Sequence, residues 1–188
     1  MDLRILPNLL LDIIRNPTKA FQEIKERTLI FESLLILLTA NILSFILLET
    51  TAKVYHTPLP TIIYPQIMIS LLIPFVLAFL INFFAARRYD AKNNYWEILS
   101  SIFFIRFILI IGYFLAIILI KINLIQFVSF LNISFLIWSL VLDIIAIKTV
   151  YVLSTKDSLY VFFNTFILFG LMFLCGTFFY NFFLLNSL

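Results

Sequence analysis

The sequence has one cysteine, Cys175, and one histidine, His56. A single cysteine excludes a disulfide framework and any metal site built from several cysteines. The chain also lacks a glycine-rich phosphate loop, a GxSxG nucleophile motif and an HExxH zinc motif. These absences predict a protein that is not an enzyme and that holds no metal or other cofactor.

Charge is scarce as well. Charged residues make up 12% of the 188 residues, about half the share typical of soluble domains, and hydrophobic residues make up 63%. With a mean hydropathy of +1.12, too few polar residues are present to cover a water-exposed particle. With 3 Gly and 6 Pro against 23 Phe, linker-like and disordered chains are also excluded. The composition predicts a fold inside a lipid bilayer.

In place of charge the chain has five long apolar stretches. A helix needs about 20 apolar residues to cross a hydrocarbon core of ~30 Å, because its backbone polar groups must bond within the segment. The stretches cover residues 28–48, 62–86, 97–120, 128–147 and 159–185. They predict an all-α, polytopic membrane helix bundle, in which a five-helix transmembrane domain over residues 28–188 follows an interfacial segment over residues 1–27.

Lysine and arginine are distributed unevenly about these spans. Two residues, Lys53 and Lys121, lie in the first and third connections, and Arg106 lies within the third span. The other ten precede the first span or lie in the second and fourth connections: Arg4, Arg15, Lys19, Lys25, Arg27, Arg87, Arg88, Lys92, Lys148 and Lys156. The positive-inside rule therefore predicts a cytoplasmic N-terminus and an extracytoplasmic C-terminus. The net charge of +3 reflects this topology, and we expect no nucleic-acid partner.

Residues 1–27 are predicted to form two short amphipathic helices. Asn16 followed by Pro17 is typical of a helix N-cap and first helical position, so the second helix is expected to begin there. No apolar core of a signal peptide precedes these helices, and we expect the N-terminus to be retained. We favour contact of the apolar face with lipid headgroups over packing of a flap on the bundle. The face comprises Leu6, Leu10, Ile13, Phe21 and Ile24.

Two local patterns predict helix geometry elsewhere. Ser154 and Asp157 have the spacing of a capping box, which marks a helix start between the fourth and fifth spans. Ser101, Gly112 and Ala116 fall close to one face of the third span and predict a close approach of a neighbouring helix.

Polar side chains inside the spans are the candidate functional residues, because an ionisable group at membrane depth is costly unless it is paired or hydrated. Arg106 lies about nine residues, or ~13 Å, from the start of the third span. Asp143 lies at a similar depth and is expected to approach it if spans three and four form an antiparallel hairpin. With three further residues they predict one polar layer: Arg106, Asp143, Glu32, Asn82 and Asn164.

This layer has two interpretations. In the structural interpretation, which we favour, its members pair between helices and fix their rotation. In the functional one, Arg106 binds an anion while Asp143 or Glu32 exchanges a proton.

Three segments of the chain resemble the Yip1 domain family of small five-span membrane proteins. They are Asn16–Ile24, Tyr89–Trp96, and Ile137–Leu140 continuing through Ala146–Ser154. The resemblance implies a cytoplasmic N-terminus. For eukaryotic members it also implies a role in vesicle traffic with Rab-type GTPases and other Yip1-like proteins as partners. The long acidic N-terminal region of those members is absent from this sequence, which resembles a compact prokaryotic form. No binding residues are carried over.

Two functions remain in competition. The first is non-enzymatic membrane organisation or scaffolding, with the lipid bilayer and other membrane proteins as partners. The second is transport, either as a small-solute transporter or as the substrate-binding membrane subunit of an uptake system, with the layer around Arg106 and Asp143 as the substrate site.

Overall fold

The protein is a bundle of helices in a computed structural model that describes residues 5–54 and 63–186. The side chains of residues 63–69 and 176–186 lie outside the described set, as does His56. The described residues form seven helices and no strand. The helices are α1 (Leu6–Arg15), α2 (Pro17–Arg27), α3 (Ile30–Val54), α4 (Ile63–Tyr89), α5 (Tyr95–Lys121), α6 (Gln126–Tyr151) and α7 (Thr155–Asn186).

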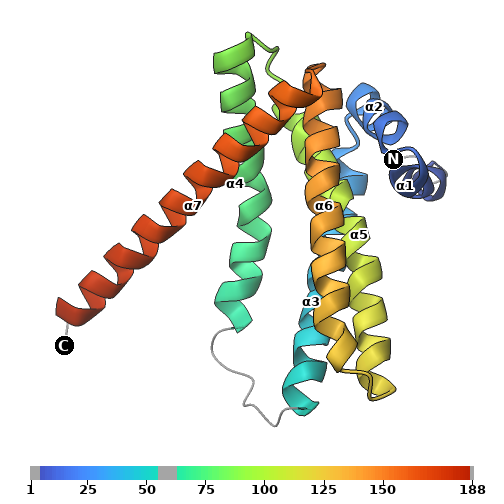
Figure 1. The fold of residues 1–188 in the computed structure, drawn as a ribbon, viewed down its shortest axis with the longest axis vertical. Helices are drawn as coiled ribbons and strands as arrows, with labels where there is room; N and C mark the ends of the chain where they lie inside the picture. The colour runs from blue at the N-terminus through green and yellow to red at the C-terminus, as the bar shows by residue number, and fades with distance from the viewer. Residues whose placement is uncertain (1–4, 55–62, 187–188) are drawn as a thin grey trace.

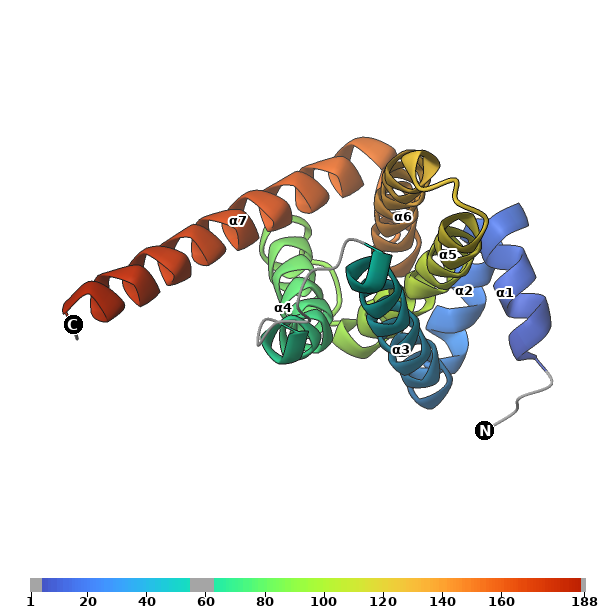
Figure 2. The same ribbon diagram turned by 90° about the horizontal axis from the view of Figure 1, so that it is seen from below.

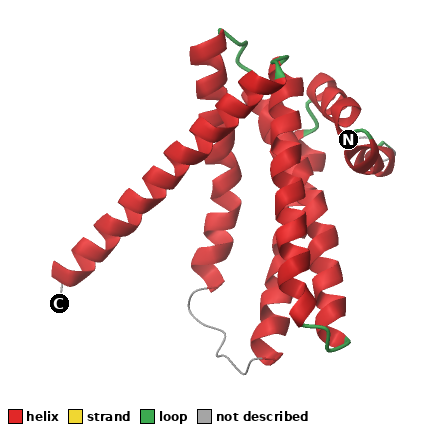
Figure 3. Cartoon of the chain, viewed as in Figure 1, coloured by secondary structure: helices red, strands yellow, loops and turns green. Residues whose placement is uncertain are grey.

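The five helices from α3 to α7 are each long and apolar enough to cross a membrane, which confirms the five predicted spans. The helices α3, α5 and α6 lie side by side, while α7 packs on α4 and α6 and then diverges from the bundle (Figures 1 and 2). One end of the bundle carries α1, α2, the α4–α5 loop and the α6–α7 turn, and we call it the α1–α2 end (Figure 3). The α5–α6 turn lies at the opposite end.

Both predicted helix starts are confirmed. Pro17 begins α2, and the side chain of Asn16 accepts a hydrogen bond of 3.4 Å from the backbone N–H of Lys19. At the start of α7, the Ser154 hydroxyl accepts from the backbone N–H of Asp157 at 3.2 Å and donates to its carboxylate at 2.6 Å. These side chains satisfy N–H groups that have no partner within a helix.

Left-handed residues reverse the chain between helices, and none of those described is a glycine. Their backbone φ angles are positive: 46° at Thr28, 48° at Asp90, 61° at Asn123 and 56° at Val152. Asn and Asp tolerate this region, whereas a β-branched residue is strained in it. Val152 is also 80% exposed, so no packing within the chain compensates its conformation. The turn after α6 is therefore a strained, outward-facing point of the structure.

The apolar face of α1 and α2 packs against the protein. Ile13, Phe21 and Ile24 have no solvent exposure, and Leu6 and Leu10 are partly buried against the same core. Side chains enclosed by protein cannot contact headgroups, so Ile13, Phe21 and Ile24 do not make the predicted lipid contact, while for Leu6 and Leu10 it stays a prediction. The alternative of a flap packed on the bundle describes this face better. The physical reason is that α2 buries its apolar stripe on α5 and α6.

Helix α5 is the most enclosed of the spans. Its residues Ile98–Ile105 are all buried, as are Gly112 and Ala116 farther along. At Gly112 the helix α6 comes so close that an added Cβ atom would lie 3.0 Å from Cγ of Phe135. Together with the buried Ser101, this confirms that the small residues of the third span mark a close approach.

Gly112 and Gly170 form a matched pair for testing this packing. Gly112→Ala should lower the free energy of unfolding by roughly 1–3 kcal/mol, because Phe135 must shift to admit the methyl group. A Cβ at Gly170 meets no atom within 4 Å, so Gly170→Ala should leave stability equal or raise it by up to about 1 kcal/mol through helix propensity. The measurement is the Tm of each full-length variant in one detergent. Equal shifts for both variants would contradict the close α5–α6 approach.

Candidate functional site

Arg106 lies between two internal spaces of the bundle. The larger is a cavity of about 240 Å³ lined by residues of α4, α5, α6 and α7, and we call it the Arg106 cavity. The smaller, of about 40 Å³, is lined by residues of α3, α4 and α5. Arg106 directly follows the buried stretch Ile98–Ile105 of α5. Its own side chain is half-buried and lines both spaces.

The Arg106 cavity brings the two predicted charges together. Arg106 and Asp143 both line it, and Ser139 adds a hydroxyl one turn before Asp143. Its remaining wall is apolar and includes Phe166 and Phe169 of α7. The ion pairs within 4.0 Å among the described residues are Lys19–Asp12, Arg27–Glu23 and Lys53–Glu49. Arg106 and Asp143 therefore share the cavity without a direct salt bridge. A cavity of this size has room for water or a small polar molecule between its few polar groups.

The smaller space holds polar residues that the sequence reasoning missed. The Ser70 hydroxyl of α4 donates to the Asn41 side-chain oxygen of α3, and the Asn41 amide donates to the Leu37 carbonyl at 2.9 Å. Ser44 and Tyr113 complete the polar lining around Arg106. Asn41, a polar residue in the middle of the first span, was the one sign of this polar group in the sequence. These groups give Arg106 a second polar neighbourhood, in a space that Asp143 does not line.

Asn82 belongs to a different network, at the α1–α2 end. Its side-chain oxygen accepts from the Tyr151 hydroxyl at 2.9 Å and from the backbone N–H of Asn94 at 3.2 Å. The Asn94 amide in turn donates to the Val150 carbonyl at 3.1 Å. We call these four residues the Asn82 network. It ties α4, the α4–α5 loop and the last turn of α6 together.

Glu32 and Asn164 also lie apart from the Arg106 cavity. Glu32 is buried in the first turn of α3, nine residues or about 13 Å along the helix from Asn41. Asn164 donates to the carbonyl of Tyr160 in its own helix at 2.7 Å. The predicted single layer therefore needs correction: similar depth does not place side chains on facing surfaces, and the structure joins Arg106 with Asp143 alone.

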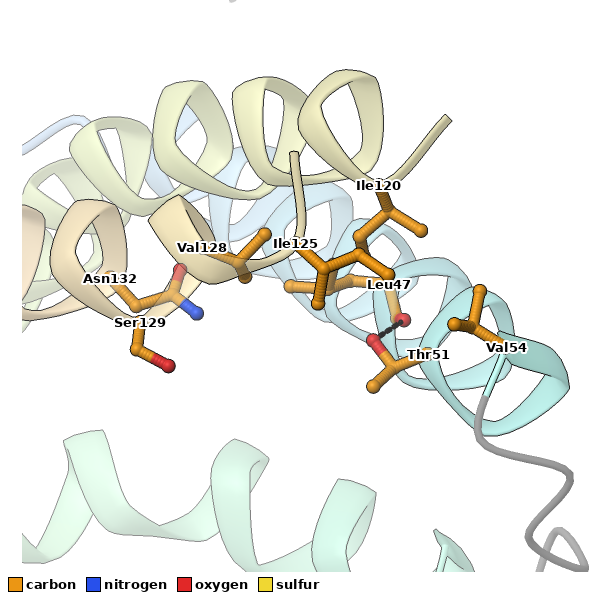
Figure 4. A pocket seen from close by; sticks show the side chains of 8 residues that line it. All are labelled: Leu47, Thr51, Val54, Ile120, Ile125, Val128, Ser129 and Asn132. Atoms are coloured by element: carbon orange, nitrogen blue, oxygen red, sulfur yellow. Dashed lines mark hydrogen bonds between the residues drawn. The ribbon is translucent and has the colours of Figure 1, made fainter. Parts of the chain in front are cut away.

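A third space opens near the opposite end of the bundle. It measures about 260 Å³ and lies between α3, α5 and α6 (Figure 4). Thr51, Ser129 and Asn132 supply its polar groups, and the Thr51 hydroxyl donates to the Leu47 carbonyl at 2.8 Å. No charged side chain lines it. The described residues contain no group of three His, Cys, Asp or Glu that could hold a metal ion.

The Asn82 network predicts a large effect for one buried amide. Asn82→Leu should lower the free energy of unfolding by about 1–3 kcal/mol, because the Tyr151 hydroxyl and the Asn94 N–H lose their acceptor. Asn164→Leu is the control, since its bond lies within one helix and should change stability by less than about 1 kcal/mol. Thermal unfolding in detergent measures both. An equal loss in the two variants would show that the network does not tie the elements together.

Comparison with known proteins places the sequence in one family. The model of the Yip1 domain matches residues 11–177, and this range contains all three segments that resemble the family. No curated protein and no solved structure matches the chain. In the fold, the segments Tyr89–Trp96 and Ala146–Ser154 are joined by the bond from Asn94 to Val150. The matched range covers most of the 188 residues, and the chain belongs to the Yip1 domain family.

Proposed function

We propose that this integral membrane protein organises membranes without catalysing a reaction, by presenting a rigid platform to other membrane proteins. The platform consists of α1, α2, the α4–α5 loop and the α6–α7 turn. The observation that carries the proposal is the Asn82 network, which fastens the loop and the end of α6 to α4. A connection held by several helices keeps one shape, as a binding surface requires.

Exposed apolar side chains on the platform support this proposal. Val152 is 80% exposed in a strained left-handed conformation, and Trp96 is 54% exposed at the start of α5. Strain of this kind persists where the surrounding structure imposes it, and it clusters at functional positions. A partner that covers Val152 would remove its contact with water. We therefore place the centre of the platform at the turn after α6.

The orientation of the platform follows from charge. Arg87 and Arg88 lie in the last turn of α4, and Lys92 lies in the α4–α5 loop. Lys148 lies in the last turn of α6 and Lys156 in the first turn of α7. These segments lie at the same end as α1 and α2 (Figure 1). Lys53 and Lys121 end α3 and α5 at the opposite end. By the positive-inside rule, we propose that the platform faces the cytoplasm and that the C-terminus lies on the other side.

A protease site inserted after Lys92 tests this orientation. It should be cut in inverted membrane vesicles and protected in intact cells, because the platform is then cytoplasmic. A second site appended after Leu188 should show the opposite pattern and is the matched control. Cleavage of the Lys92 site from outside intact cells would contradict the proposal.

Transport is the second candidate function, and the Arg106 cavity favours it. Opposite charges face one space among four helices without bonding each other directly, so a small anionic or dipolar solute has a cation and a carboxylate to contact. In the structural alternative, the same two charges stabilise each other across water.

A photo-crosslinking amino acid at Val152 separates the two functions. In native membranes we expect the same membrane proteins to be captured in independent preparations, Yip1-like proteins or GTPases among the possible identities. The same probe at Ile167, which is 62% exposed in the middle of α7, should capture lipid. Equal protein capture at both positions, or none at Val152, would contradict the platform.

The double variant Arg106→Leu with Asp143→Leu completes this test. Replacing opposite charges inside a bundle together by apolar residues is often tolerated, so the variant should fold, as monodisperse elution and Tm would show. Unchanged capture at Val152 is expected if the cavity is structural. A well-folded double variant that loses capture would favour the cavity as the functional site.

A further inference from the structure

A groove at the α1–α2 end lies between α2 and the last turns of α6. It measures about 350 Å³ and is separate from the Arg106 cavity. From α2 it is lined by Thr18, Gln22, Lys25 and Glu26, which recur at helical spacing along one stripe. The opposite face of α2 buries Ala20, Phe21 and Ile24. Packing of the apolar face therefore fixes the direction of the polar stripe.

The other wall of the groove comes from the end of α6. Lys148 and Thr149 are polar, and Val152 and Leu153 add apolar surface at the mouth. The Lys148 ammonium also donates to the Thr155 hydroxyl at 3.1 Å, which orients it while leaving two of its three N–H groups. The groove thus combines hydrogen-bond donors with an apolar rim.

The two lysines of the groove differ from their basic neighbours on α2. Lys19 bonds the Asp12 carboxylate at 2.9 Å, and this hydrogen bond raises the pKa of Lys19. Arg27 pairs with Glu23 at 3.2 Å. Neither Lys25 nor Lys148 has a carboxylate within 4.0 Å among the described residues. With Glu26 as the one acid in its lining, the groove carries two positive charges and one negative charge.

The helices beside the groove have two features that are typical of a membrane interface. The helices α1 and α2 lie crosswise to the spans on the flank of α5, rather than over the end of the bundle (Figures 1 and 2). On α1, Leu11 and Ile14 are 48% and 43% exposed, and Trp96 in the first turn of α5 is 54% exposed. An amphipathic helix parallel to the membrane and an aromatic residue at a span end are typical of the interface.

We propose that this groove binds the headgroup phosphate of an anionic phospholipid. Lys25 and Lys148 hold the phosphate oxygens, and Thr18, Gln22 and Thr149 offer further donors. Glu26 accepts from a hydroxyl of a glycerol-type headgroup, while Leu153 lies toward the glycerol backbone and acyl chains. The single negative charge of such a lipid matches the net charge of the groove. The site goes beyond the proposed scaffolding function and does not depend on it.

Lipid titration of the purified full-length protein tests the site. The protein in detergent is titrated with short-chain phosphatidylglycerol or phosphatidylcholine, and native mass spectrometry counts the bound lipids. Phosphatidylglycerol should bind more tightly. The double variant Lys25→Gln with Lys148→Gln should weaken its binding roughly thirtyfold, which corresponds to about 2 kcal/mol for two lysines.

The matched control is Lys92→Gln with Lys156→Gln, which removes the same charge from exposed positions outside the groove. It should retain most of the binding, and Lys148→Arg with Lys25 intact should retain it as well. Unchanged affinity in the groove variant, or an equal loss in the control, would overturn the proposal. Elution volume and Tm establish that each variant is folded.

Inorganic phosphate distinguishes the two sources of the same chemistry. Phosphate at millimolar concentration should not displace the lipid, because it lacks the acyl chains that contact the rim. Displacement together with phosphate binding in lipid-free detergent would assign the groove to a soluble phosphate and overturn its assignment to lipid. Val152 also lines the groove, so only protein captured at Val152, and not lipid captured there, measures the scaffolding function. With that distinction, either proposal can fail alone.

Discussion

The enclosure of α5 is the constraint on which the rest of the structure depends. Helices α1, α2, α3, α4 and α6 all contact α5, and its residues Ile98–Ile105 are buried throughout. In a membrane, apolar side chains gain nothing by leaving lipid, so close van der Waals packing must hold the helices together. Small residues permit it, as at Gly112 beneath Phe135. Helix α7 lies on α4 and α6 at the edge of this arrangement.

Arg106 shows how the enclosed helix accommodates a charge. The arginine comes directly after the buried stretch, where α5 begins to face cavities as well as its neighbours. Asp143 lines one of these cavities with Arg106, and the hydrogen-bonded Asn41 and Ser70 line the other with it. An ionisable group in a span is costly without such surroundings. The same arrangement can stabilise the charges within the bundle or bind a solute. A well-folded variant that lacks both charges is therefore needed to distinguish scaffolding from transport.

The α1–α2 end combines three features that are distant in sequence. The Asn82 network fixes the loop before α5 to the end of α6, the N-terminal helices pack on the flank of α5, and a basic groove lies between α2 and α6. Two of the segments that resemble the Yip1 domain family meet here through Asn94 and Val150. The resemblance thus corresponds to a contact in space. A platform with a lipid site at its edge would be held at a defined depth in the membrane.

Sequence alone determined the features that arise from local physics. Spans follow from length and hydropathy because helical backbone bonds are made within each segment, and the starts at Pro17 and Thr155 follow from neighbouring side chains. The short α5–α6 turn allowed the sequence to predict that Arg106 and Asp143 lie near each other, and both line one cavity.

Tertiary structure decided what covers each surface. Periodicity showed that Phe21 and Ile24 share an apolar face. It could not show whether lipid or protein contacts this face, because both are apolar, and in the structure protein buries it. Asn82 was likewise grouped with Arg106 because the two residues lie at similar depth in their spans. In the structure, Asn82 bonds Tyr151 and Asn94 instead. Hydrogen bonds between helices require side chains that face each other, and the rotation of each helix decides which ones do.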